Sequence, residues 1–88
     1  MILEISDKER LENEITSFRA KLGLRIAFIR TSKEISQFRL SLLTGLSKQY
    51  ISDLENGRRN VSISSLYKVA KGLEVGIEEL FSDLEQPK

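Results

Sequence analysis

Residues 37–60 read QFRLSLLTGLSKQYISDLENGRRN, and this stretch decides the fold. Apolar residues recur at helical spacing in two short segments, 37–43 and 48 to about 56, and Thr44-Gly45-Leu46 interrupts the pattern between them. A glycine between two short helices permits a tight turn, after which the second helix can project from the protein surface. The stretch therefore predicts two helices joined by a sharp turn.

The residues on both sides of this turn have sizes that suit two closely packed helices. Ser41 is small and lies four residues before the turn glycine. We expect Leu40 and Leu43 of the first helix to be buried, together with Ile51 and Leu54 of the second.

Serine residues precede three of the expected helices. Ser36, Ser47 and Ser62 each stand directly before a segment with helical spacing, and serine is a favoured helix N-cap. The third segment covers residues 63–72. Its expected buried face consists of Ile63, Leu66, Val69, Ala70 and Leu73. A last short helix is expected over residues 77–81, where two glutamates suit a helix N-terminus.

The region upstream of the turn also has a helical pattern. Apolar residues recur at steps of three and four from Leu11 to Ile29, but Gly23 weakens a helix by about 1 kcal/mol relative to alanine. One long helix and two shorter ones both fit this pattern. We therefore expect an all-α fold, a compact bundle of about five short helices. The chain divides accordingly into a partly helical N-terminal extension (1–17), the bundle (18–82) and a C-terminal tail (83–88).

Charge is unevenly distributed along the chain, although the formal net charge is only +1. Residues 1–18 carry two basic and five acidic residues, and residues 61–88 carry three basic and five acidic residues. Between them, residues 19–60 carry nine basic and three acidic residues. A basic middle segment with acidic flanks indicates a polyanionic partner such as nucleic acid.

The composition excludes several classes of function. The chain has no cysteine and no histidine, so it lacks disulfides, the usual zinc ligands, the commonest general base and the best nucleophile. Its longest apolar run, Ile26-Ala27-Phe28-Ile29, is too short to span a bilayer, and no signal peptide is visible. We expect a cytoplasmic protein that is not an enzyme, binds no metal or cofactor and has no membrane segment.

The stretch 37–60 resembles the helix-turn-helix of the phage Cro and repressor proteins, a large family of bacterial regulators. The similarity covers residues 20–81, from the LGLRI opening to the KVAKGLEVGIEELF close, and YISDLENGRRN is its most diagnostic part. Within the family, the chain most resembles the controller proteins of restriction–modification systems. Three positions depart from the usual pattern: Ser41 replaces an alanine, Glu34 a glycine that often ends the first helix, and Arg39 a glutamate.

The resemblance implies that residues 47–56 form a recognition helix whose first residues meet base edges in the major groove. Lys48 can donate to guanine, and Gln49 can pair bidentately with adenine. Ser52 and Asp53 follow one turn later, and Asp53 either accepts from cytosine or holds a neighbouring arginine in place. These four residues are the expected base contacts.

A second set of residues is expected to contact the DNA backbone. Arg39 lies in the first turn of its helix, where a positive charge is unfavourable unless a phosphate compensates it. The resemblance also implies a phosphate contact for Gln37, because the family uses the matching residue to bind the DNA backbone. The expected backbone contacts are Ser36, Gln37, Arg39, Ser47, Tyr50, Asn56, Arg58, Arg59 and Asn60, with Ser47 acting mainly as a helix cap. The basic residues of the first helix, namely Arg19, Lys21, Arg25, Arg30 and Lys33, are expected mostly to face solvent.

These expectations describe a sequence-specific transcriptional regulator that binds a palindromic operator in double-stranded DNA as a homodimer. Two-fold pairing sets two recognition helices about 34 Å apart on successive major grooves. The expected dimer interface is Val75, Phe81 and Leu84, with Leu11 and Ile15 as a second patch. No small-molecule effector is expected. The alternative is a protein-binding module on the same fold, either a coactivator or an antitoxin-type partner.

Overall fold

The computed structural model of the protein describes residues 2–84, with side chains from Ser6 onward. Its elements are α1 (Ile2–Ser32), α2 (Gln37–Thr44), α3 (Lys48–Glu55), α4 (Ile63–Leu73) and the 3-10 helix η1 (Ile77–Phe81). Residues 2–84 contain no strand, so the expected all-α fold is confirmed. The expected bundle of about five short helices needs correction. Four of the elements in this range are α-helices, the first is 31 residues long, and the last element is a 3-10 helix.

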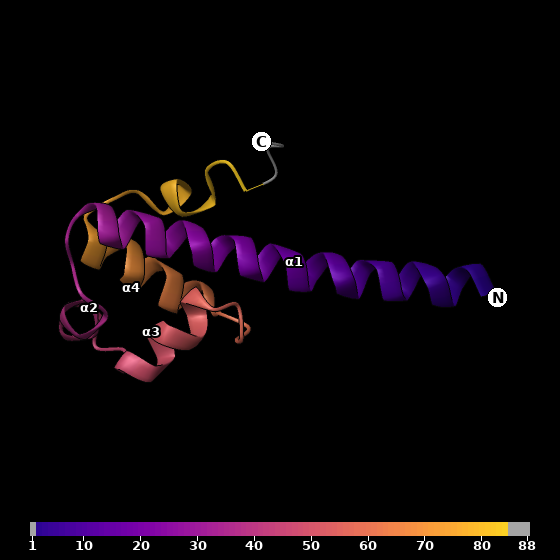
Figure 1. Cartoon of the computed structure of the whole chain (residues 1–88), viewed down its shortest axis with the longest axis horizontal. Helices are drawn as coiled ribbons and strands as arrows, with labels where there is room; N and C mark the ends of the chain where they lie inside the picture. Colours follow the sequence, from indigo (N-terminus) through magenta and orange to yellow (C-terminus); the bar gives the residue numbers. More distant parts are fainter. Residues whose placement is uncertain (1, 85–88) are drawn as a thin grey trace.

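α1 runs without a break through Gly23, which decides between one long helix and two shorter ones. Its C-terminal half packs against α3 and η1, whereas its N-terminal half projects beyond the other elements (Figure 1). Gly23 faces the end of α3, where an added Cβ atom would collide with the carbonyl oxygens of Leu54 and Glu55. The glycine that weakens an isolated helix therefore lets α1 lie close against α3.

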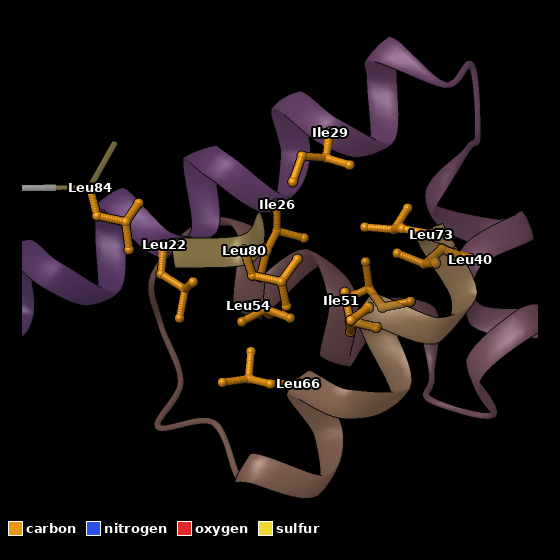
Figure 2. Close-up of a cluster of buried hydrophobic side chains, with 12 residues drawn as sticks. Leu22, Ile26, Ile29, Leu40, Ile51, Leu54, Leu66, Leu73, Leu80 and Leu84 are labelled. Atoms are coloured by element: carbon orange, nitrogen blue, oxygen red, sulfur yellow. The ribbon is translucent and has the colours of Figure 1, made fainter. Parts of the chain in front are cut away.

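The hydrophobic core lies between the C-terminal half of α1 and the shorter helices (Figure 2). Its buried apolar residues are Leu22, Ile26, Ile29, Leu40, Ile51, Leu54, Leu66, Val69, Ala70, Leu73, Leu80 and Leu84. Every helical element contributes to this core, and both helices of the expected turn motif supply residues to it. The motif is therefore held rigidly to the rest of the domain.

Two residues that were expected in the core are exposed, so those predictions were wrong. Leu43 lies at an open cleft between Arg39 of α2 and Lys71 of α4, where 46% of its surface is exposed. Ile63 is the first residue of α4 and precedes the buried Leu66 by three residues, ahead of the packed part of the helix.

The three expected serine caps all form. Ser36, Ser47 and Ser62 each accept the backbone N–H of the residue three positions later, at 2.9, 2.9 and 3.0 Å. These bonds satisfy donors that the first turn of a helix leaves without a partner. The sequence therefore predicted the starts of α2, α3 and α4 correctly.

The end of α1 shows how the chain accommodates a residue that departs from the family pattern. α1 ends at Ser32, and Glu34 then adopts a left-handed backbone conformation with a φ of 59°. Glycine adopts this conformation without strain, whereas a residue with a Cβ atom is disfavoured by roughly 1–2 kcal/mol. Glu34 thus holds a strained turn between α1 and α2.

The chain after η1 corrects one expected interface residue. Asp83 has a φ of 66°, the chain turns back there, and Leu84 is buried beside α1 with 6% of its surface exposed (Figure 2). The expected exposure of Leu84 was therefore wrong. Phe81 remains partly exposed and stacks on Phe18 of α1, with 6.4 Å between the ring centroids, and Val75 is half-buried. The rest of the expected tail, residues 85–88, lies outside the described residues.

None of the helices in the described part of the chain is long and apolar enough to cross a membrane, α1 included.

Candidate nucleic-acid interface

A short, fixed turn places α3 at the protein surface. α2 ends at Thr44 and is capped by Gly45, whose φ of 80° few other residues adopt, and the Gly45 N–H donates to the Ser41 carbonyl at 2.9 Å. The hydroxyl of Thr44 accepts the backbone N–H of Leu46 at 3.1 Å. The Ser47 cap follows at once, so hydrogen bonds fix the start of α3 relative to the end of α2.

α3 has one buried and one exposed side. Ile51 and Leu54 point into the core, and both are almost completely buried. Lys48 and Gln49 in the first turn are exposed, and Ser52 is half-buried. The N-terminal turn of α3, with its unpaired backbone N–H groups and its long polar side chains, is therefore open to a partner.

Asp53 connects the polar side chains on this exposed side. Its Oδ1 accepts a hydrogen bond from Nε2 of Gln49 at 2.9 Å and lies 3.8 Å from Nη1 of Arg58. Its Oδ2 lies 3.4 Å from Nη2 of Arg59, whose Cζ lies 4.4 Å from the centroid of the Tyr50 ring. Five of the predicted DNA-contacting residues thus form one connected cluster. Asp53 was expected either to accept a hydrogen bond from cytosine or to hold a neighbouring arginine in place, and this arrangement agrees with the second role.

The loop after α3 is anchored to α1 at both of its ends. Gly57 has a φ of 71° and lies so close to Ala20 that an added Cβ atom would be 2.9 Å from the Ala20 Cα. At the other end, Nη1 of Arg19 donates to Oδ1 of Asn60 at 2.6 Å. The two arginines between these anchors are exposed. They therefore project from a fixed stretch of backbone.

Sequence reasoning missed a buried ion pair behind this surface. The Glu55 carboxylate accepts from Nε of Arg30 at 2.6 Å and from Nη2 at 3.0 Å, and the two side chains are 5% and 12% exposed. Arg30 also donates to the Ile35 carbonyl at 2.7 Å, and Gln37 donates to Glu55 at 2.9 Å. The network ties α1, α2 and α3 together. The available signal was a glutamate four residues after Ile51, on the buried side of α3, where a charge requires a partner.

Several basic residues of α1 make specific contacts, so the expectation that they mostly face solvent was wrong. Arg30 belongs to the buried pair with Glu55. Nε of Arg25 donates to the Glu79 carbonyl at 3.0 Å and thereby fixes η1 to α1. Lys21 and Lys33 are exposed as expected.

The remaining predicted backbone contacts lie at the ends of α2 and α3. Ser36 and Ser47 use their hydroxyls as helix caps, and the Asn56 amide donates to the Ser52 carbonyl at 2.8 Å. Arg39 is exposed in the first turn of α2. No cluster of three or more acidic, histidine or cysteine side chains that could hold a metal ion occurs in the described part of the chain. The exposed donors are thus suited to an anionic, hydrogen-bonding partner.

Comparison with known proteins identifies the family. The helix-turn-helix family HTH_3 matches residues 26–80. The control protein C.MunI of a Mycoplasma species is 34% identical over 73 residues, which cover 82% of this chain and 99% of that protein. The crystal structure of the restriction-modification controller protein C.AhdI from Aeromonas hydrophila is 40% identical with a TM-score of 0.70, covering 70% of this chain and 94% of that one.

A third relative has been solved with DNA. The restriction-modification controller protein C.Esp1396I, a tetramer in complex with its natural 35 base-pair operator, is 36% identical with a TM-score of 0.70. The matched region covers 76% of this chain and 88% of that one. The resemblance to repressor-type regulators and controller proteins is thereby confirmed, and the relatives named here are regulators rather than enzymes. The chain belongs to the helix-turn-helix family of transcriptional regulators.

Proposed function

We propose that this protein is a sequence-specific DNA-binding regulator that reads its operator with α3. One observation carries the proposal: the capped N-terminus of α3 stands at the surface behind a fixed turn, with Lys48 and Gln49 exposed. The free N–H groups and the positive end of the helix dipole favour an approaching phosphate backbone. Lysine and glutamine at this place can then reach base edges in the major groove.

The proposed base readers are Lys48, Gln49 and Ser52, which lie on consecutive turns of α3 and are at least partly accessible. Lys48 carries a flexible cation suited to guanine O6 and N7. Gln49 carries no charge, so its contribution is to specificity rather than to general affinity. Asp53 lies one turn after Gln49 and supports it by accepting a hydrogen bond from its amide.

Phosphate contacts are proposed at both sides of α3. On one side lies the capped start of α2, with Ser36, Gln37 and Arg39. On the other side lies the anchored loop with its two exposed arginines. The full proposed set is Ser36, Gln37, Arg39, Ser47, Tyr50, Asn56, Arg58, Arg59 and Asn60. Because these groups flank the base readers, they can set the register of α3 in the groove.

We further propose that two copies bind a palindromic operator. One short recognition helix reads only a few base pairs, whereas a symmetric pair reads two half-sites. The tetramer that C.Esp1396I forms on its operator supports assembly on DNA. Val75 and Phe81 remain in the proposed interface, and Leu84 does not because it is buried within one chain. Leu11 and Ile15, exposed on the projecting half of α1, are a second proposed patch.

This function requires neither catalysis nor a cofactor, and it places the protein in the cytoplasm with the nucleoid.

The test starts with selection of a binding sequence from a random duplex library, followed by titration of the selected duplex and a scrambled one at two salt concentrations. We expect a palindromic sequence bound at least about a thousandfold more tightly than the scrambled duplex. A protein that enriches no sequence and shows no salt-dependent binding would contradict the proposal and favour the protein-binding alternative.

A further inference from the structure

We propose that Asp53 is a positioning residue that sets DNA specificity and not a base contact. In the free protein it orients the Gln49 amide and pairs with Arg58 and Arg59, which reduces their attraction to the phosphates of random DNA. The inference rests on the proposed function and adds a mechanism of selectivity to it.

The first argument is that both Asp53 oxygens already have partners within the chain. A carboxylate only accepts hydrogen bonds, and Oδ1 and Oδ2 face three donor side chains from α3 and the following loop. The Asp53 side chain is only 20% exposed. Gln49 and Arg59 each donate a hydrogen bond to one of these oxygens, so a cytosine amino group would have to fit beside donors that are already in place. The geometry therefore favours support of the neighbouring donors over contact with a base.

The second argument concerns the orientation of the Gln49 amide. Because a carboxylate cannot donate, the amide must turn its nitrogen toward Asp53, and Nε2 is the atom found there at 2.9 Å. This leaves one N–H and the Oε1 atom free. Those are the donor and the acceptor that bidentate pairing with adenine N7 and N6 requires. Asp53 thus orders Gln49 before DNA arrives without occupying the groups that read the base.

The third argument is electrostatic. Arg58 and Arg59 share one carboxylate, so the three side chains together carry a charge of +1 and not +2. A phosphate of random DNA must compete with Asp53 for each arginine, which lowers the affinity by about two- to fivefold per exposed pair. The operator offers base contacts to Gln49 in addition, so binding there still proceeds. The same carboxylate therefore lowers random binding and supports specific binding.

The chain contains a matched control for this effect. Asp7 is also an aspartate paired with an arginine, Arg10, but it belongs to the N-terminal half of α1, which projects beyond the other elements (Figure 1). Asp7→Asn changes the net charge and the residue volume as Asp53→Asn does. Any effect that follows from net charge alone must appear equally in both variants.

The experiment measures the affinity of wild type, Asp53→Asn and Asp7→Asn for the selected operator and for a scrambled duplex over a range of salt. For Asp53→Asn we expect scrambled DNA to be bound about four- to tenfold more tightly and the operator no more tightly than by wild type. The ratio of the two affinities should fall by at least fourfold. The slope of log K against log salt on scrambled DNA should steepen, by up to about 0.9 for each arginine released, because the wild-type arginines are only partly available to phosphates. Asp7→Asn should leave the ratio and the slope at wild-type values.

A second measurement isolates the positioning role. If Asp53 acts on the operator through Gln49, its effect on specificity should disappear once Gln49 is removed. In a Gln49→Ala background, Asp53→Asn should therefore leave the ratio of operator affinity to scrambled-DNA affinity unchanged. It should still steepen the salt slope. Asp53→Glu, which keeps the charge, should restore the wild-type slope.

The results separate this inference from the proposed function. Loss of affinity by the same factor on both duplexes in Asp53→Asn, or equal behaviour of Asp53→Asn and Asp7→Asn, would overturn the role of Asp53 alone. A wild-type protein that shows no sequence preference would overturn the proposed function and this inference with it.

Discussion

Two carboxylates that stand two residues apart on α3 have opposite surroundings. The Glu55 side chain is 5% exposed and accepts two hydrogen bonds from Arg30 and a third from Gln37. The Asp53 side chain is 20% exposed, and its arginine partners are 66% and 42% exposed at distances of 3.8 and 3.4 Å. The same pairing of acid and arginine therefore fixes the fold on one side of α3. On the other side it stays open to exchange with a ligand.

Burial decides the energetics of each pair. Removing one partner of a buried pair leaves an unpaired charge in a poorly solvated place, which costs several kcal/mol. Breaking an exposed pair costs little because water replaces the missing partner. Glu55 also stands in the last turn of its helix, where a negative charge opposes the dipole, so it depends on Arg30 all the more. α3 accordingly has a supporting side and a reading side.

The largest predicted effect breaks the supporting side. Glu55→Ala leaves Arg30 buried without its carboxylate, so the free energy of unfolding should fall by about 3–5 kcal/mol. Chemical denaturation followed by circular dichroism measures this loss. Asp53→Ala on the same helix serves as the control and should cost less than about 1 kcal/mol. Equal losses in the two variants would contradict the contrast between the two carboxylates.

The next effect concerns reading alone. Gln49→Ala should reduce discrimination at one base pair per half-site by about 1–3 kcal/mol, because alanine cannot pair bidentately with a base. Binding to scrambled DNA should hardly change. Titrations with operator variants substituted one position at a time give the measurement. An equal loss of affinity on every duplex would indicate that Gln49 contacts the DNA backbone or stabilises the fold.

The exposed arginines should affect DNA binding without changing the fold. Arg58→Ala combined with Arg59→Ala should weaken binding to operator and scrambled DNA alike, and should lower the salt slope by about 0.9 for each phosphate that is no longer neutralised. The melting temperature should stay within a few degrees of wild type, since both pairs are exposed. An unchanged salt slope would remove these arginines from the interface.

The smallest effect should change stability and leave reading intact. Glu34→Gly relieves a left-handed backbone conformation and should raise the free energy of unfolding by about 1 kcal/mol, or the melting temperature by about 4–8 °C. Glu34 makes none of the proposed DNA contacts, so discrimination between the operator and scrambled DNA should not change. A lower melting temperature would show that the Glu34 side chain stabilises this turn by more than its strain costs.

The contrast between the two sides of α3 also explains what the sequence could predict. The serine caps and the turn glycine act on residues within four positions, so the starts of α2, α3 and α4 follow from local chemistry. The charge and polarity of Lys48 and Gln49 likewise indicate their exposure without knowledge of the fold. For the same reason, the predicted site consists largely of residues that need no distant partner.

The features that the sequence did not predict all depend on distant partners. The pair of Arg30 with Glu55 joins residues 25 positions apart, and Gly23 is explained only once the end of α3 is seen beside it. Leu84 is buried beside α1 after the left-handed turn at Asp83, and the local sequence does not show that this distant helix covers it. Periodicity shows which side of a helix is apolar, but it does not show which other element covers that side.

The most direct test of the central claim maps the operator onto the protein. Titration of ¹⁵N-labelled protein with the selected operator, followed by amide chemical shifts, locates the interface residue by residue. We predict the largest changes over residues 36–39 and 47–60, with the projecting part of α1 around residues 6–10 unaffected. Changes concentrated elsewhere, such as around the exposed Leu42 of α2 without involvement of α3, would contradict a recognition role for α3.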